Sequence, residues 1–216
     1  MDADPRAGMG RPVHPGRSAG SALHAMESVC SDQWYGAHLA VDHLVGLGHR
    51  RMVFATRDDG PTVRTVRAAL SEIAAAHPLV EGWAWVPGSS GSGAEAQRDG
   101  DGTALSAASL REPGVTAAVL HGNVDALMIV QWLAASGARV PRNCSAVAYD
   151  NVVVGLGTPP LTAVSPPKGE VGRVAAEVLP GRLDGSYRNP ARPVQRTELW
   201  PTLTVRGSTR ERTSAP

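Results

Sequence analysis

The sequence is poor in aromatic residues, and this scarcity limits what its core can be made of. Phenylalanine, tyrosine and tryptophan together make up 4% of the 216 residues, whereas hydrophobic residues of all kinds make up 42%. We therefore expect a core built mostly from alanine, valine and leucine. The length and hydrophobic content are sufficient for one large or two small domains with a sizeable interior.

Cysteine and lysine are also scarce. Cys30 and Cys144 are far apart and form no CxxC pair, so the sequence predicts neither a metal site nor a disulfide framework. Two free thiols in a reducing cytosol are expected instead. Lys168 is the only lysine beside 20 arginines, which are scattered along the chain. With a net charge of +1, the composition gives no support for a nucleic-acid-binding surface.

Long apolar runs are absent as well. No run approaches the ~18 apolar residues that a membrane-spanning helix needs. The first 28 residues contain no apolar segment of the kind found in signal peptides. The sequence therefore predicts a soluble cytoplasmic protein that has no membrane partner.

Motifs typical of enzymes and of cofactor sites are missing. The sequence has no His-Glu-x-x-His, and neither a Gly-x-Ser-x-Gly nor a Gly-x-Gly-x-x-Gly follows a predicted strand. Asp58 and Asp59 are adjacent in a turn, where two carboxylates usually point apart into solvent. His121 and Asp150 could lie close together, but such a pair without a nucleophile or a metal is not a mechanism. We expect a protein that is not an enzyme, with no catalytic residue, no cofactor and no metal site.

Short apolar segments alternate with amphipathic ones along most of the chain. The predicted strands lie at 52–55, 80–86, 116–120, 145–149, 161–164 and within 194–205. The predicted helices lie at 33–48, from 61 to about 77, and at 104–110, 123–137 and 168–179. This alternation predicts an α/β fold with a parallel sheet. Residues 1–27 are expected to be a disordered tail, 87–102 a flexible loop and 210–216 a polar tail.

Two histidines fall in the first predicted helix and in the turn after it. His43 lies on the apolar stripe of the helix, which favours a hydrogen-bonded interior histidine over a metal ligand. His49 follows Gly48, where the helix is expected to end. We expect His49 to pack or to hydrogen-bond at the turn that leads into the next strand.

Polar residues follow several of the predicted strands. In an open α/β sheet, ligands bind outside the carboxyl ends of the strands. Asn123 and Asp150 stand at such ends and could exchange hydrogen bonds with sugar-like hydroxyl groups, while Arg57 or Arg64 could bind an anionic group. The alternative is structural, with Asn123 capping its own helix and Asp150 holding its own loop. Position alone leaves both interpretations open.

One stretch carries a recognisable pattern. Gly-x-x-x-Ala-x-x-His-Leu-x-x-Leu-Gly-His-Arg runs from Gly36 to Arg50, inside a longer segment from Ser31 to Thr56. Further segments agree in order and spacing at 137–141, 145–150, 158–162, 172–176 and 205–209. Together they resemble the lactose-repressor/galactose-repressor (LacI/GalR) family of bacterial transcription regulators, over roughly residues 29–209.

The resemblance implies a two-lobed sensor of the periplasmic-binding-protein-like type I fold, joined in the family to a DNA-reading helix-turn-helix. It implies a nearly complete parallel-sheet C-terminal lobe at 51–163 and 186–209. Residues 28–50 and 164–185 would be helical remnants of an N-terminal lobe that is mostly missing. The helix-turn-helix is absent from this chain, so the resemblance does not extend to DNA binding by these residues. The implied partner is a small sugar-like or nucleoside-like effector.

The resemblance also indicates where an effector would bind. Asp150 matches the acidic residue that follows the last strand of the lobe, a usual effector contact. Asn123 stands in place of one member of an Asn-Asp pair before the middle helix. The family arginine falls at or near Thr62, with Arg64 as the nearest replacement. Two aromatic residues at the start of the first helix, Trp34 and Tyr35, are expected to stack on a ligand.

The apolar stripes of two helices raise a question about partners. If helices 33–48 and 168–183 belong to a lobe that is mostly missing, their apolar faces lack a sheet to cover. Leaving them in water would cost about 1.5–3 kcal/mol for each large apolar side chain. We therefore expect a homodimer or a heterodimer. The alternatives are a stand-alone module that pairs with an intact relative, and a non-functional remnant.

Overall fold

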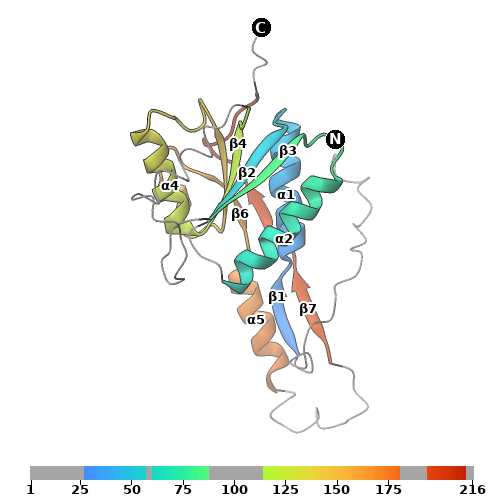
Figure 1. Cartoon of the computed structure of the whole chain (residues 1–216). Helices are drawn as coiled ribbons and strands as arrows, with labels where there is room; N and C mark the ends of the chain where they lie inside the picture. The colour runs from blue at the N-terminus through green and yellow to red at the C-terminus, as the bar shows by residue number, and fades with distance from the viewer. Residues whose placement is uncertain (1–26, 57–59, 88–113, 181–193, 213–216) are drawn as a thin grey trace, which may run out of the picture.

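The chain forms two sheets of unequal size (Figure 1). The computed structural model describes residues 27–56, 60–87, 114–180 and 194–212. Within these ranges, the larger sheet has six strands in the order β3-β2-β4-β5-β6-β8, and the smaller one pairs β1 with β7. The strands are β1 (Ser28–Ser31), β2 (Arg51–Thr56), β3 (Gly82–Pro87), β4 (Ala117–His121), β5 (Ser145–Tyr149), β6 (Thr162–Ser165), β7 (Arg196–Leu199) and β8 (Thr202–Thr204). The helices are α1 (Gln33–Gly46), α2 (Pro61–Ala76), α4 (Asn123–Ala135) and α5 (Lys168–Val178), with a short 3-10 helix, η1 (Val154–Leu156).

The expected α/β fold with a mainly parallel sheet is confirmed. Every strand pair is parallel except β6 with β8, which is antiparallel at the edge of the larger sheet. Strand β1 was not predicted. The expected tail at 1–26, the loop at 88–102, the helix at 104–110 and the end of the chain from 213 lie outside the described residues.

The central strands are continuous apolar runs because both of their faces are covered. Side chains alternate across the sheet, so Met52 and Phe54 of β2 face α1 and α2, whereas Val53 and Ala55 belong to the cluster under α4. Figure 1 shows α4 on one side of the sheet and α1 and α2 on the other. The prediction of an aliphatic core is confirmed: Phe54 and Tyr149 are the only aromatic residues among the core side chains described as buried.

The expectation that helix 33–48 faces a missing sheet is wrong. Helix α1 packs against α2 and the six-stranded sheet, so the apolar stripe is covered within this chain. Its buried residues are Gly36, Ala37, Ala40, Val41, Leu44 and Val45. The stripe correctly predicted that the helix is covered, but a periodicity does not say which sheet covers it. The error arose because the resemblance, and not the stripe, assigned residues 28–50 to the missing lobe.

A smaller unit extends from one end of the large sheet. It consists of the parallel pair β1 and β7 with α5 beside β1 (Figure 1). None of the residues of α5 is buried. Three segments of the chain connect the two parts, since β1 leads into α1, β6 into α5 and β7 into β8. The expectation of an incompletely covered apolar face therefore applies to α5 but not to α1.

The turn between α1 and β2 is held by histidine. His49 is 3% exposed, and its ring nitrogens lie within hydrogen-bonding distance of Thr116 Oγ1 (2.9 Å), Ser145 Oγ (2.9 Å) and the Arg210 carbonyl (3.1 Å). His43 Nε2 lies 3.0 Å from Thr209 Oγ1. Burial lowers the pKa of both histidines, which favours their neutral forms. Both sequence predictions for these histidines are confirmed.

Helix α1 lies very close to the end of β5 at one glycine. A Cβ atom added at Gly36 would lie 2.2 Å from Tyr149 Oη and 3.1 Å from Pro201 Cγ. The Tyr149 hydroxyl also donates a hydrogen bond to the Gln33 carbonyl, at 2.9 Å. A side chain at position 36 would therefore separate the helix from the sheet and break this bond.

We predict that Gly36→Ala destabilises the protein by about 1–3 kcal/mol, because overpacking shifts side chains and backbone. Gly46→Ala is the matched control in the same helix, since an added Cβ there meets nothing within 4 Å. It should leave stability unchanged or raise it by about 0.5–1 kcal/mol, as alanine favours the helix. Urea unfolding measures both. Equal stabilities for the two variants would contradict the close contact at Gly36.

Candidate functional site

A cavity of about 510 Å³ lies where the two parts of the chain meet. It opens at the carboxyl ends of β1, β4, β5 and β6 and at the start of α2, as expected for a ligand site in an open α/β sheet. Its lining residues are Ser31, Gln33, Gly60, Pro61, Thr62, Val63, His121, Tyr149, Asp150, Pro166, Lys168 and Val171. Chain segments distant in sequence therefore contribute to one pocket.

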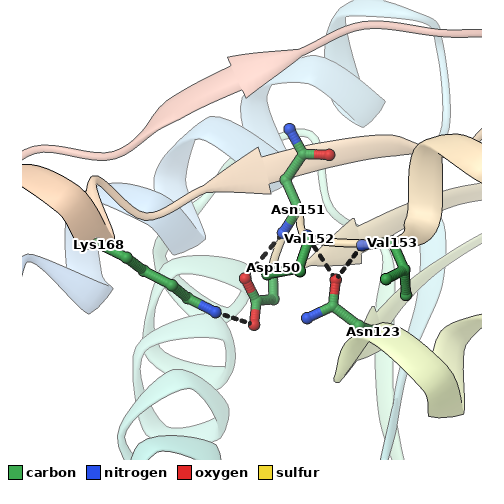
Figure 2. Close-up of polar contacts among 6 residues, drawn as sticks. All are labelled: Asn123, Asp150, Asn151, Val152, Val153 and Lys168. Carbon is green, nitrogen blue, oxygen red and sulfur yellow. Dashed lines mark hydrogen bonds and ion pairs between the residues drawn. The ribbon is translucent and has the colours of Figure 1, made fainter.

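Asp150 is held in this pocket by its own loop and by a lysine. Its Oδ1 accepts a hydrogen bond from the Asn151 amide at 2.8 Å, and its Oδ2 lies 2.6 Å from Lys168 Nζ (Figure 2). Its backbone φ is 113°, in a region that side-chain-bearing residues rarely adopt. Such strain costs roughly 1–3 kcal/mol and persists at sites where a side chain must be aimed. The ion pair joins the end of β5 to the first residue of α5.

Asn123 positions the loop that carries Asp150. Its Oδ1 accepts hydrogen bonds from the Val152 amide at 2.6 Å and from the Val153 amide at 3.1 Å (Figure 2). Asn151 fixes the same loop from the other side, since its Nδ2 donates to Ser165 Oγ at 2.8 Å. Asn123 is not among the residues that line the pocket. The structural alternative, that Asn123 caps its own helix, is wrong: Gly122 is the N-cap of α4, without a side-chain hydrogen bond, and Asn123 holds the loop after β5 instead.

The predicted positions on α2 are divided between the pocket and the surface. Thr62 lines the pocket in the first turn of the helix. Arg64 lies two residues further on, is exposed and does not line the cavity. Because successive helical residues are rotated by about 100°, the side chain at 64 is carried away from the face that Thr62 presents.

The structure does not bring the two predicted aromatic residues to the pocket. The ring of Tyr35 stacks on that of Trp200, with centroids 5.0 Å apart. Trp34 is partly buried against the core cluster under α1 and α2. Both side chains therefore pack on other parts of the fold, and neither lines the cavity.

Five pocket residues with polar side chains were not among the predicted site residues: Ser31, Gln33, His121, Tyr149 and Lys168. His121 stacks on Tyr149 with ring centroids 5.8 Å apart, which gives the pocket a flat aromatic wall. Burial, and secondly the negative charge of Asp32, raise the pKa of Tyr149, so its hydroxyl remains a donor. The rule that finds Asp150 points to Ser31, His121 and Tyr149 when it is applied to the last residue of each strand, including the unpredicted β1. Gln33 and Lys168 begin helices and are not found by it.

The pocket offers several kinds of hydrogen-bonding group. It combines a carboxylate, an ammonium group, hydroxyls and amides, and the Asp150–Lys168 pair carries no net charge. No group of histidine, cysteine, aspartate or glutamate suited to a metal ion occurs among the described residues.

The cysteines are free thiols, as predicted, and burial raises the pKa of Cys144 to about 12, which keeps that thiol unreactive. Within the described ranges, no helix is long and apolar enough to cross a membrane.

Comparisons with known proteins point to one family. A family model described as a periplasmic binding protein-like domain matches residues 41–209. The HTH-type transcriptional regulator CelR of Thermobifida fusca is 36% identical over 90 residues, which cover 41% of this chain and 26% of that protein. The ribose operon repressor of Escherichia coli (strain K12) is 36% identical over 93 residues, which cover 42% of this chain and 27% of that protein.

A solved structure supports the same fold. A LacI family transcriptional regulator from Enterococcus faecalis V583, crystallised with bound ribose, matches with a TM-score of 0.69 and 19% identity. The match covers 89% of this chain and 67% of that one. The matched segments span about a quarter of the length of the two curated relatives.

We predict that Asn123→Ala loosens the loop after β5, because two backbone amides lose their acceptor at a cost of about 1–3 kcal/mol. Hydrogen exchange at Val152 and Val153 should become faster than in the unmodified chain. Asn123→Asp keeps an acceptor oxygen at the same place and should retain most of the protection. Unchanged exchange in Asn123→Ala would show that Asn123 does not hold this loop.

Proposed function

Because the chain belongs to the periplasmic binding protein-like family, in the form carried by LacI-family transcriptional regulators, we propose that it is the effector-sensing part of such a regulator. The effector is a small neutral molecule rich in hydroxyl groups, bound in the cavity beside Asp150. In this proposal the chain acts by binding rather than by catalysis. Contact with DNA is supplied by a helix-turn-helix outside these 216 residues.

The observation that carries this proposal is the fixed carboxylate at the carboxyl end of β5. A carboxylate accepts hydrogen bonds from two neighbouring hydroxyls of a sugar, and charge-assisted bonds of this kind are among the stronger ones. Lys168 Nζ, 2.6 Å from Asp150 Oδ2, can donate to the same ligand. The volume of about 510 Å³ falls within the usual range for small-molecule sites.

The charge of the pocket supports a neutral effector over a phosphorylated one. A phosphate would need an excess of positive charge, but Asp150 already balances the ammonium of Lys168. The stacked rings of His121 and Tyr149 can pack against the apolar face of a sugar or against a nucleoside base. The names of two relatives, a ribose operon repressor and a regulator with bound ribose, favour a sugar as the first candidate.

The position of the pocket suggests how binding could be transmitted. Ser31 and Lys168 come from the unit of β1, β7 and α5, whereas Thr62 and Asp150 come from the side of the larger sheet. A ligand that contacts both sides favours the arrangement in which both sets of contacts are made.

We predict that a sugar of the pentose or hexose class raises the melting temperature of the chain. Saturation at about 100 times the dissociation constant stabilises the folded state by about 2.7 kcal/mol. Asp150→Asn should weaken binding about tenfold or more, since it removes a charged acceptor. Glu72→Gln, at an exposed carboxylate on α2, is the matched control and should bind normally. A melting temperature unmoved by ribose, by other sugars and by nucleosides would count against effector sensing.

Dimerisation is the second part of the proposal, and it concerns the face of the smaller unit. A hollow of about 210 Å³ there is lined by the apolar side chains of Val29, Ala175, Val178 and Leu179, among others. Leu179 is 54% exposed and Val194 is 49% exposed. An uncovered apolar face of this kind is typical of a surface that meets another chain. The partner is a second copy or, in the alternative, an intact relative.

We predict that the chain sediments as a dimer at micromolar concentration, because pairing removes this face from water. Leu179→Glu should shift it toward a monomer by placing a charge on the face. Leu79→Glu changes a leucine of similar exposure, 48%, in the segment between α2 and β3 and should leave the dimer intact. A monomer that binds no apolar dye would refute the dimer.

A further inference from the structure

Two buried oxygen atoms on one wall of the pocket have no hydrogen-bond partner within the described residues. They are Ser31 Oγ and the side-chain oxygen of Gln33, Oε1. Both residues line the same cavity as Asp150 and Lys168. Ser31 is the last residue of β1, and Gln33 is the first residue of α1, so one short segment supplies both.

The backbone of this segment is firmly held. Ser31 pairs with Leu199 in the ladder between β1 and β7, and the Asp32 amide donates to the Leu199 carbonyl at 2.8 Å. The Asp32 carboxylate caps α1 by accepting from the Tyr35 amide at 2.9 Å. The Gln33 carbonyl accepts from the Tyr149 hydroxyl. Because the backbone is fixed at these points, only rotation of the two side chains can bring their oxygens to another partner.

Buried polar groups without partners are rare in folded proteins because each one lowers stability. One such atom can be incidental. Two of them, on residues two positions apart that both line one cavity, are better explained by a ligand that supplies the missing partners. Functional sites commonly retain groups that weaken the free protein in this way.

We propose that Ser31 and Gln33 are specificity-determining contacts for the effector, a role that rests on the proposed sensing function. The amide oxygen of Gln33 can only accept, so it selects a ligand hydroxyl or N–H group. The Ser31 hydroxyl can donate or accept. Together with Asp150, Lys168 and Thr62 they require a ligand that carries hydrogen-bonding hydroxyls on more than one side. A ligand that is polar at one end only would leave these oxygens unpaired.

The test replaces each oxygen with an apolar group of similar shape. The variants are Ser31→Ala and Gln33→Leu in the full chain, each measured without ligand and with D-ribose. Without ligand, the melting temperature should stay unchanged or rise by a few degrees, because a buried unpaired group has been removed. With D-ribose, each variant should bind roughly five- to tenfold more weakly than the unmodified chain, the loss of one hydrogen bond.

Two matched controls separate this result from a general effect of mutation. Ser71→Ala removes an exposed hydroxyl on α2, and Gln131→Leu changes an exposed glutamine on α4. Neither residue lines the pocket, so both controls should bind D-ribose like the unmodified chain. Calorimetric titration measures the affinities, and thermal unfolding measures the stabilities.

The melting temperature and the affinity for D-ribose test different parts of the inference. A lower melting temperature in both variants would show that the oxygens have structural partners and would overturn the inference. Unchanged affinity for D-ribose would overturn it as well. If the unmodified chain binds no sugar while both variants are as stable as it or more so, the proposed function fails. The finding that the two oxygens are unpaired in the folded chain then still stands, but their assignment as effector contacts is overturned with it.

Discussion

The close contact between α1 and the end of β5 is the constraint on which the rest of the structure depends. Gly36 leaves room for the ring of Tyr149, and the Tyr149 hydroxyl binds the Gln33 carbonyl at the first turn of the helix. This contact lets α1 lie flat on the six-stranded sheet and cover the apolar face of β2, β4 and β5. It also sets the wall of the pocket, because Tyr149 and Gln33 both line the cavity. Core packing and ligand-site geometry are therefore determined at the same place.

The pocket is supported by groups that do not themselves line it. Asn123 fixes the loop backbone after Asp150 from one side, and the network of Ser165 and Thr204 holds Asn151 from the other. These bonds keep the strained backbone of Asp150 in place, with its carboxylate beside Lys168. A side chain held in this way needs little reorganisation when a ligand arrives, which favours tight and selective binding.

Much of the fold could be predicted from the sequence because the relevant signals are local. The continuous apolar runs predict strands at β2, β4 and β5, and the apolar stripe predicts a helix at α2. The site was predictable where one rule about strand ends applied, as for Asp150. Strand β1 was missed because it forms by pairing with residues far away in sequence, such as Leu199. The sheet that covers α1 was assigned wrongly because it, too, comes from distant parts of the chain. Tyr35 was misplaced for a similar reason, since only the fold reveals Trp200 as its stacking partner.

The single lysine has a practical consequence for chemistry done on this protein. Lys168 carries the only side-chain amine in the sequence, and 57% of its side chain is exposed. Acylating reagents and amine-reactive fluorophores are thereby directed, among all side chains, to the mouth of the cavity. The charge that acylation removes is the one that faces Asp150. Lys168 is thus the one side chain at which an amine-reactive reporter group is attached, and the same step alters the local charge balance.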